Sequence, residues 1–511
     1  MIVVYHNYKR VTEITGIELR DDVTTFTLPQ VLKKIATEYR NEIIVWCADE
    51  VKELLNLLIL PEVMHHHNLL VSYAFNNYMG EAIGYVDASL YCNENKEFPY
   101  GTWQMSGMVG VTSSEVLNNI TDEFYEITNF TYFLNSVAKI YMPLGLLCYS
   151  DPRLLINREN GVETPVASVS ELFRFVKEHY KTTWSWLLLL NFLIYEKKLY
   201  VGSFLKTFLF KKRGLKASSM NIEVSSTKKI DSDFSIDVII PTIGRKEYLY
   251  DVLTDLKNQI HLPVKVIIVE QNPVPESVSE LDYITKEAWP FEIDHTFTHQ
   301  TGACNARNIA LSKVTSDWVF LNDDDNRFDG NLISEVFKRI KKYGVQVVMT
   351  SYCKPSEQKT YIHTFQPPFF GSGNSFMKSS LLKKVKFNMA LEFGYGEDTE
   401  FGLQLRNLGE DVIYLADVDI THLNAPRGGF RTKFVQAWDN DALQPKPSPT
   451  IMYVMQKYST LKQLYGYKTT LMLKFYRSQS IKNPFKYMKV FKQRWERSII
   501  WANKLKEKHE V

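Results

Sequence analysis

Residues 315–328 have the sequence Thr-Ser-Asp-Trp-Val-Phe-Leu-Asn-Asp-Asp-Asp-Asn-Arg-Phe, and the organisation of the chain can be worked out from them. An apolar run, Trp318 to Leu321, ends in three consecutive carboxylates, which predicts a buried strand that leaves the core into an acidic turn. Clustered carboxylates raise one another's pKa unless a cation joins them, and oxygen ligands suit a hard divalent ion such as Mg²⁺ or Mn²⁺. An exposed acidic turn that caps the next helix is the alternative interpretation.

The sequence around this turn predicts a mainly parallel sheet. Apolar runs at 236–240, 264–269 and 318–321 alternate with helical patterns at 248–260 and 302–311. This alternation is typical of parallel strands joined by right-handed crossovers, and ligands bind beyond the carboxyl ends of such strands. Polar positions follow three of these ends, at Pro241-Thr242, Glu270 and the acidic turn. Their shared position favours a binding site over an exposed turn.

The composition indicates a globular protein with more than one domain. A chain of 511 residues is too long for one core, and a hydrophobic fraction of 45% excludes a disordered chain. A net charge of +2 gives no signature of nucleic-acid binding. The five cysteines form no CxxC pair and no zinc spacing, which favours a reducing compartment. The first ten residues lack the pattern of a signal peptide, so we expect a cytoplasmic protein, either free in the cytosol or peripheral on the inner face of the cell membrane.

Four segments are expected. Residues 1–180 would form an N-terminal α/β domain of unclear role, 181–235 a basic aromatic segment and linker, 236–445 the sheet domain, and 446–511 a basic helical tail. The apolar run 184–195 is too short to span a bilayer, and lysines follow it. It fits a helix that lies in an anionic membrane interface, or else a buried interdomain helix with a basic edge. Residues 457–511 hold fourteen Lys or Arg against three Glu, which favours a second membrane contact or a solvated helical tail.

Five motifs follow one another between residues 236 and 425. They are Val238-Ile-Ile-Pro-Thr242 with Arg245, Gly302 with Ala306-Arg307-Asn308, Asp323-Asp324-Asp325, Glu397-Asp398, and His422. In this order they resemble an inverting glycosyltransferase of family 2, which has the GT-A fold of nucleotide-diphospho-sugar transferases, and the acidic turn is similar to the DxD motif of that family.

The resemblance implies roles for single residues. The implied donor-binding residues are Pro241, Thr242, Arg245, Glu270, Gly302, Arg307, Asn308, Asp323 and Asp324. Glu270 stands where the family usually has an aspartate that contacts the base of the nucleotide. The implied metal ligands are Asp325, Asp323 and His422, and the implied catalytic pair is Asp398, as general base, with Glu397. Gly428-Gly429-Phe430-Arg431 would close over the diphosphate, with Arg427 or Arg431 as phosphate contacts.

The function implied is transfer of a sugar from a nucleotide-sugar donor to a glycan or lipid-linked acceptor, with Mn²⁺ or Mg²⁺, in bacterial surface polysaccharide synthesis. Expected partners are the donor, the acceptor and an anionic membrane surface, with no nucleic acid. Two alternatives stay open: a sugar nucleotidyltransferase and a non-catalytic glycan-binding scaffold subunit. The first would need a glycine-rich basic loop after the first strand, where residues 241–247 have one glycine.

The N-terminal half is a candidate diverged copy of the same GT-A architecture. Residues 43–49 have the pattern of a strand that ends in an acid, and residues 107–120 are similar in pattern to residues 373–382. No acidic triplet lies between 49 and 107, so such a copy would be non-catalytic and would serve acceptor binding or dimerisation.

Overall fold

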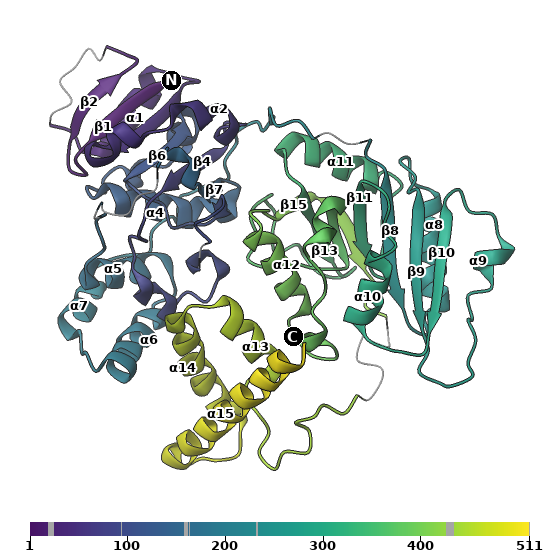
Figure 1. The fold of residues 1–511 in the computed structure, drawn as a ribbon. Helices are drawn as coiled ribbons and strands as arrows, with labels where there is room; N and C mark the ends of the chain where they lie inside the picture. The colour runs from purple at the N-terminus through teal and green to yellow at the C-terminus, as the bar shows by residue number, and fades with distance from the viewer. Residues whose placement is uncertain are drawn as a thin grey trace. The chain divides into compact units, whose positions relative to one another are not determined.

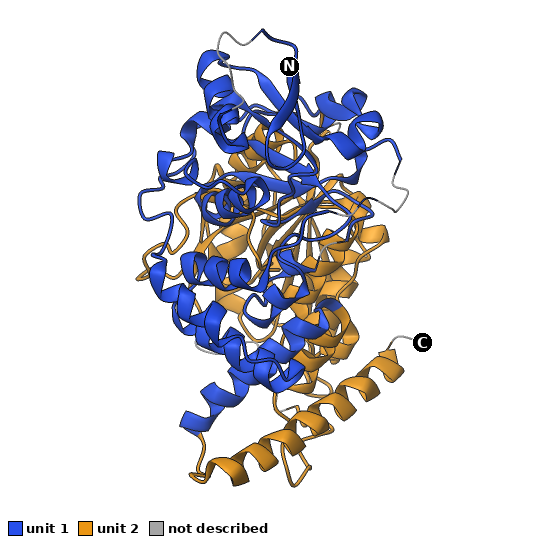
Figure 2. Cartoon of the chain, turned by 90° about the vertical axis from the view of Figure 1, so that its left-hand side faces the viewer, with its two compact units in different colours: residues 1–228, 458–478 blue, residues 229–457, 479–511 orange. Residues whose placement is uncertain are grey.

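The computed structural model describes residues 1–18, 25–93, 95–157, 162, 164–230, 233–425 and 434–509 (Figure 1). The chain forms two compact units, coloured separately in Figure 2. Unit 1 comprises residues 1–228 and 458–478, and unit 2 comprises residues 229–457 and 479–511. Most of the segment predicted at 181–235 therefore belongs to unit 1. The predicted tail at 446–511 is helical in large part and is divided between both units.

Unit 2 is built on an eight-stranded sheet. Its strands, in sheet order, are β10 (Glu292–Thr298), β9 (Lys265–Gln271), β8 (Ile236–Thr242), β11 (Trp318–Asn322), β14 (Asn374–Lys378), β13 (Val347–Cys353), β15 (Ile413–His422) and β12 (Asn326–Arg327). The first four are parallel, and β14 and β12 run antiparallel to their neighbours. The predicted mainly parallel sheet is confirmed. The long strand β15 has a register shift in its pairing with β13.

Helices complete the α/β layers of unit 2. They are α8 (Lys246–Lys257), α9 (Tyr283–Lys286), α10 (Ala303–Leu311), α11 (Leu332–Tyr343), α12 (Glu397–Asn407), α13 (Pro449–Tyr458) and α15 (Pro484–His509). The helical patterns predicted at 248–260 and 302–311 are thus α8 and α10. Phe320 of β11 and Phe376 of β14 are fully buried, with ring centroids 4.0 Å apart, so the strand that leads into the acidic turn is fixed in the centre of the sheet.

Unit 1 has a seven-stranded sheet of its own. Its strands, in sheet order, are β2 (Val11–Thr15), β1 (Ile2–His6), β3 (Ile43–Ala48), β6 (Val109–Ser113), β4 (Leu69–Tyr73), β7 (Leu147–Ser150) and β5 (Tyr100–Gly101). Its helices are α1 (Leu28–Glu38), α2 (Leu60–Val63), α3 (Ser114–Asn119), α4 (Phe130–Tyr141), α5 (Val169–His179), α6 (Thr183–Asn191), α7 (Val201–Lys206) and α14 (Leu461–Ser478). The second mixed α/β domain expected from the sequence is confirmed.

The two sheets share an arrangement of five strands. The neighbouring strands β1-β3-β6-β4-β7 of unit 1 correspond to β8-β11-β14-β13-β15 of unit 2. In both sets the strands, read across the sheet, come first, second, fourth, third and fifth along the chain. In both sets the successive pairs are parallel, antiparallel, antiparallel and parallel. The segments of similar pattern, 107–120 and 373–382, contain the matching strands β6 and β14. This shared topology supports the hypothesis that unit 1 is a diverged copy of the GT-A architecture.

One side of the apolar run 184–195 packs into the core of unit 1. Leu188 and Phe192 are buried, and α6 packs against α5, α7 and α14. The Thr469 hydroxyl of α14 donates to the Asn191 side-chain oxygen at 2.6 Å, which ties α14 to α6. The structure therefore favours the buried helix over a helix in the membrane interface, although this helix is buried within unit 1 and not between domains. No helix in the described part of the chain is long and apolar enough to cross a membrane.

Removing a buried side chain from α6 tests this packing. We expect Leu188→Ala to lower the free energy of unfolding by about 2–5 kcal/mol, because the truncation leaves a cavity in the core. Leu193→Ala, at an exposed position close by, should cost less than half as much. Urea denaturation of the full chain measures both, and equal small losses would show that α6 is not a core helix.

Candidate active site

A cavity of about 320 Å³ lies at one edge of the sheet of unit 2. Its walls include the ends of β8, β9 and β15, the acidic turn after β11, and the start of α10. The loop at 391–397, which leads into α12, forms a further part of the wall. The cavity therefore opens beyond the carboxyl ends of parallel strands, where α/β sheets bind ligands.

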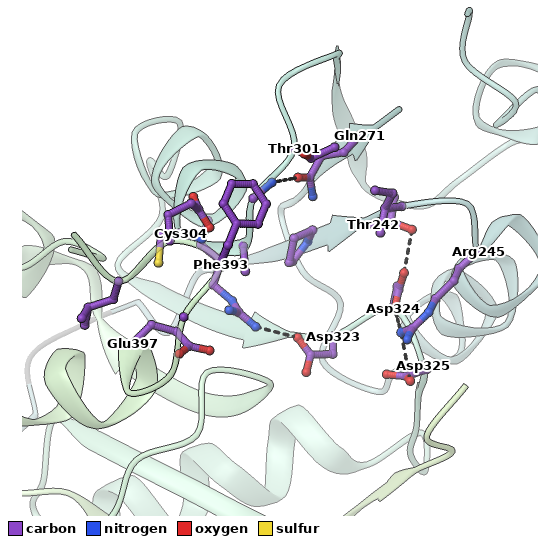
Figure 3. Close-up of a pocket in the computed structure, with 18 of the residues that line it drawn as sticks. Thr242, Arg245, Gln271, Thr301, Cys304, Asp323, Asp324, Asp325, Phe393 and Glu397 are labelled. Carbon is purple, nitrogen blue, oxygen red and sulfur yellow. Dashed lines mark hydrogen bonds and ion pairs between the residues drawn. The ribbon is translucent and has the colours of Figure 1, made fainter. Parts of the chain in front are cut away.

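Two carboxylates of the acidic turn share one arginine. Asp324 accepts a hydrogen bond from the Thr242 hydroxyl at 2.7 Å and also pairs with Arg245 (Figure 3). The same Arg245 nitrogen lies 2.9 Å from an oxygen of Asp325. The other Asp325 oxygen lies 3.5 Å from Nε2 of His422 at the end of β15. The turn is thus tied both to the end of β8 and to the end of β15.

The third carboxylate, Asp323, points to a different cation. Arg307 of α10 is buried and donates to Asp323 at 3.1 Å. Gly373 allows this placement, because a Cβ there would lie 2.2 Å from the other Asp323 oxygen. The Tyr352 hydroxyl lies 3.4 Å from that same oxygen. Asp323 therefore has a positive charge on one side and a phenol on the other.

The carboxylates of the turn differ in acidity. Burial raises the pKa of Asp324 to about 7, against the opposing effects of Arg245 and Thr242. Burial alone would also raise the pKa of Asp325, but hydrogen bonds from His422 and from the Ala425 amide outweigh it and lower the pKa. The hydrogen bond to Asp325 in turn raises the pKa of His422. Asp325 is thus the member of this pair that stays ionised at neutral pH.

Gly302 starts α10 in a conformation that glycine adopts readily. Its φ is +138°, and a Cβ there would lie 2.4 Å from the Glu392 carboxylate. That carboxylate accepts hydrogen bonds from the amides of Asn305 at 2.7 Å and Cys304 at 3.1 Å. Gln271, at the end of β9, accepts from the Gly302 amide at 2.7 Å. Both acceptors satisfy amides that a helix start leaves unpaired, so they fix the position of α10 against the sheet.

The acidic pair stands at the first turn of α12. Glu397 lines the cavity, and burial together with the neighbouring Asp398 charge raises its pKa. Asp398 accepts a hydrogen bond from the Ser372 hydroxyl. Burial raises the pKa of Asp398, while the positive charge of Arg307 acts in the opposite direction. A carboxylate with a raised pKa is better suited to accept a proton near neutral pH than an ordinary aspartate.

The structure brings most of the predicted site residues to one cavity. Those that line it are Pro241, Thr242, Arg245, Gly302, Arg307, Asp323, Asp324, Asp325, Glu397 and His422. Asp398 is next to this lining. Glu270 is not part of it and bonds instead to His295 at 2.9 Å. Asn308 also lies outside the lining and exchanges two hydrogen bonds with the Phe387 backbone, at 2.8 and 2.9 Å. Arg427 and Gly428–Arg431 lie outside the described residues.

Several lining residues were not predicted. They include Gln271, Thr301, Glu392, Phe393 and Asn424, and Ser372 bonds to Asp398. Phe393 precedes the Gly-Tyr-Gly sequence before the acidic pair, and that glycine-rich segment is the one local signal that could have pointed to it. The others come close to the site through the fold.

The predicted metal ligands are not assembled as a set of three. Within the described ranges, no three His, Cys, Asp or Glu side chains stand together in a way that could hold an ion by themselves. Asp325 and His422 are close to each other, whereas Asp323 is directed to Arg307. Such a two-residue set fits an ion that takes its other ligands from phosphate and water, as Mg²⁺ commonly does.

The same region matches a known protein family. Residues 237–394 match the model described as Glycosyl transferase family 2. Residues 237–394 form a family 2 glycosyltransferase domain. The match extends from β8 through β14 to the loop before α12, so it includes the acidic turn and Gly302. The resemblance proposed from the motifs, and the GT-A type of sheet that it implied, are confirmed.

Two proteins with assigned names are similar to part of this chain. An uncharacterized glycosyltransferase of Rickettsia bellii is 26% identical over 151 residues, which are 30% of this chain and 21% of that protein. Glycosyltransferase GlyA of Streptococcus pneumoniae serotype 4 is 21% identical over 214 residues, which are 36% of this chain and 30% of that protein. The chain therefore matches less than a third of the length of either relative. A crystal structure of S. aureus TarS 1-349 is 16% identical, with a TM-score of 0.33, and covers 49% of this chain and 74% of TarS 1-349.

Adding a methyl group at the start of α10 tests its role in the family 2 domain. We expect Gly302→Ala to lower the free energy of unfolding by about 1–3 kcal/mol, because alanine is strained at this φ and its Cβ would displace Glu392. Gly202→Ala is the matched control, since a Cβ there meets nothing within 4 Å. Thermal unfolding of the two variants should therefore separate them, and similar midpoints would contradict this account of Gly302.

Proposed function

We propose that this chain is a metal-dependent, inverting glycosyltransferase. It would move a sugar from a nucleotide-sugar donor to a hydroxyl group of a glycan or lipid-linked acceptor. One observation carries the proposal: the acidic turn and the start of α12 line the same cavity, which has a volume of about 320 Å³. Bacterial surface polysaccharide synthesis stays a prediction of the biological setting.

The donor side of the cavity suits a sugar diphosphate. Mn²⁺ or Mg²⁺ held by Asp325 and His422 would offset the negative charge that develops on the leaving nucleoside diphosphate. Arg245 holds Asp324 and Asp325 in place, so it orients the carboxylate that would bind the ion. Arg307 places a second guanidinium in the lining, beside Asp323. Guanidinium groups are well suited to bind phosphate oxygens, which supports a diphosphate in this position.

Asp398 is the proposed general base. An acceptor hydroxyl is a poor nucleophile at neutral pH and needs a group that takes its proton. Asp398 would accept that proton while the hydroxyl oxygen forms a bond to the anomeric carbon and the bond from that carbon to the diphosphate breaks. Attack from the face opposite the leaving group inverts the anomeric carbon in one step. The Ser372 hydroxyl, which donates to Asp398, would fix the direction of its carboxylate.

A second cavity supports a glycan acceptor. It has a volume of about 460 Å³, belongs to unit 2, and is lined by Gly371, next to Ser372. Its aromatic lining residues are Tyr352, Tyr361, Phe369 and Tyr414, and its polar ones include Glu357, Gln358 and Asn374. Aromatic faces pack on the C–H faces of sugar rings while polar groups bind the hydroxyls. Because Tyr352 also contacts Asp323, this cavity lies directly beside the proposed donor site.

Donor turnover with and without metal tests the proposed function. A panel of nucleotide sugars is incubated with the wild-type chain in Mn²⁺, Mg²⁺ or EDTA, and nucleoside diphosphate release is measured. We expect one donor to be hydrolysed, with loss of turnover in EDTA and in Asp325→Ala. Asp398→Asn should bind that donor normally but lose about 10²–10⁴-fold in transfer, the usual contribution of a general base.

Asp417→Asn is the control, because it changes an exposed aspartate of unit 2 that pairs with Arg339. It should retain wild-type turnover. Release of pyrophosphate from a nucleoside triphosphate and a sugar phosphate would favour the nucleotidyltransferase alternative. Failure to bind any nucleotide sugar, with or without metal, would favour the scaffold alternative.

Truncation of an aromatic side chain tests the acceptor cavity. We expect Tyr361→Ala to reduce transfer to a glycan acceptor at least tenfold through a higher acceptor KM, because the variant removes one aromatic face of the second cavity. Hydrolysis of the donor alone should not change, since Tyr361 does not line the first cavity. An equal loss of hydrolysis and transfer would show that Tyr361 acts on the donor site or on folding.

A further inference from the structure

A stripe of apolar side chains lies exposed on unit 1. Val201 and Leu205 of α7, and Phe208 and Leu209 of the following turn, are 43%, 56%, 58% and 79% exposed. Leu205, Phe208 and Leu209 follow Val201 by four, seven and eight residues, and this spacing places all four on one face of a helix. Phe204 and Thr207, between them in the sequence, are buried in the core. This segment therefore has a second apolar face, which the described part of the chain leaves in solvent.

Helix α6 extends the stripe. Trp186 is 55% exposed, and its ring centroid lies 4.3 Å from that of Phe204. The Phe204 ring in turn lies 5.6 Å from Phe208. Trp186 and Phe208 are thus both neighbours of one buried ring, and α6 and α7 lie side by side in unit 1 (Figure 1). We call Trp186, Val201, Leu205, Phe208 and Leu209 the α7 stripe.

The charges around the α7 stripe are positive. Five exposed lysines lie close to it in the sequence: Lys197, Lys198, Lys206, Lys211 and Lys212. The only acid between Trp184 and Lys216 is Glu196. Its carboxylate accepts hydrogen bonds from Lys462 at 2.5 Å and from the Tyr85 hydroxyl at 3.0 Å, so its charge is already paired within unit 1. The stripe is therefore a bare apolar surface with a cationic border.

We propose that the α7 stripe binds the surface of an anionic lipid bilayer. Leucine and phenylalanine at the centre would enter the boundary between headgroups and acyl chains, and Trp186 would lie at headgroup depth, which aromatic indole rings favour. The bordering lysines would contact anionic headgroups. The sequence left a membrane helix and a buried helix both open for residues 184–195. Buried side chains of that run belong to the core, so the proposed contact falls mainly to residues 201–209. This proposal does not depend on the catalytic activity.

Vesicle flotation of the full chain tests the α7 stripe. Vesicles of phosphatidylcholine alone are compared with vesicles that contain one quarter phosphatidylglycerol. The wild-type chain should float with the anionic vesicles, and less so at high salt. The triple variant Leu205→Ser/Phe208→Ser/Leu209→Ser should bind them at least tenfold more weakly. Lys211→Gln/Lys212→Gln should weaken binding severalfold and reduce its dependence on salt.

The matched control removes three other exposed apolar side chains, in the triple variant Leu58→Ser/Ile260→Ser/Val278→Ser. It should float like the wild-type chain. All variants should retain wild-type donor hydrolysis in solution, because none of the changed residues lines either cavity of unit 2. Failure of the proposed glycosyltransferase activity would thus appear in hydrolysis, and failure of the membrane proposal in flotation.

Tryptophan fluorescence gives a second readout with an intact stripe. Emission of the wild-type chain should move to shorter wavelength with anionic vesicles, and Trp186→Phe should remove most of that shift. Equal flotation of the stripe variant and the wild-type chain would overturn the proposal. A second outcome would also overturn the proposal: the wild-type chain does not bind vesicles but forms a dimer in light scattering, and the stripe variant does not form that dimer. This outcome would assign the stripe to contact with a second copy of the chain.

Discussion

Burial of two neighbouring carboxylates, Asp324 and Asp325, beside the half-buried Asp323 is the constraint on which the rest of unit 2 depends. Carboxylates out of water are costly unless cations and hydrogen bonds compensate them. Arg245, just beyond β8, compensates Asp324 and Asp325, and Arg307 of α10 compensates Asp323. These contacts hold the end of β8, the end of β11 and the start of α10 in fixed positions relative to one another. The cavity is lined by these paired charges, and the proposed metal ion and diphosphate would bind among them.

Much of this site could be predicted because its residues follow strand ends. The apolar runs before Thr242 and Asp323 indicated buried strands, and a parallel sheet places such ends at one edge. Partners that are distant in the sequence gave no such signal. Glu392 caps α10 from 88 residues beyond Cys304, and Ser372 orients Asp398 from another loop. For Glu270, the predicted position at a strand end is correct, but the predicted contact with the donor is not supported. Its side chain is bonded to His295 and does not line the cavity.

The basic aromatic segment shows why composition does not determine exposure. Residues 184–195 are apolar on all sides, a pattern of buried helices as well as of membrane helices. What decides between them is a neighbour from the far end of the chain: Thr469 of α14 bonds to Asn191 across a separation of 278 residues. The shorter α7 is covered on one face only, which leaves the other for a partner outside unit 1. A local pattern can thus predict that a helix is apolar, but the tertiary contacts decide which of its faces stays in solvent.

The two sheets share a strand order but differ in how the acids at matching positions are placed. In unit 1, β3 occupies the place that β11 has in unit 2, and it is also followed by acids, Asp49 and Glu50. These acids are exposed, and Asp49 accepts its hydrogen bond from the hydroxyl of Thr12 and not from an arginine. Carboxylates that remain in water do not require compensating cations, so nothing draws the surrounding elements together into a charged cavity there. The same order of strands can therefore carry a family 2 site in one unit and only exposed acids at the matching position of the other.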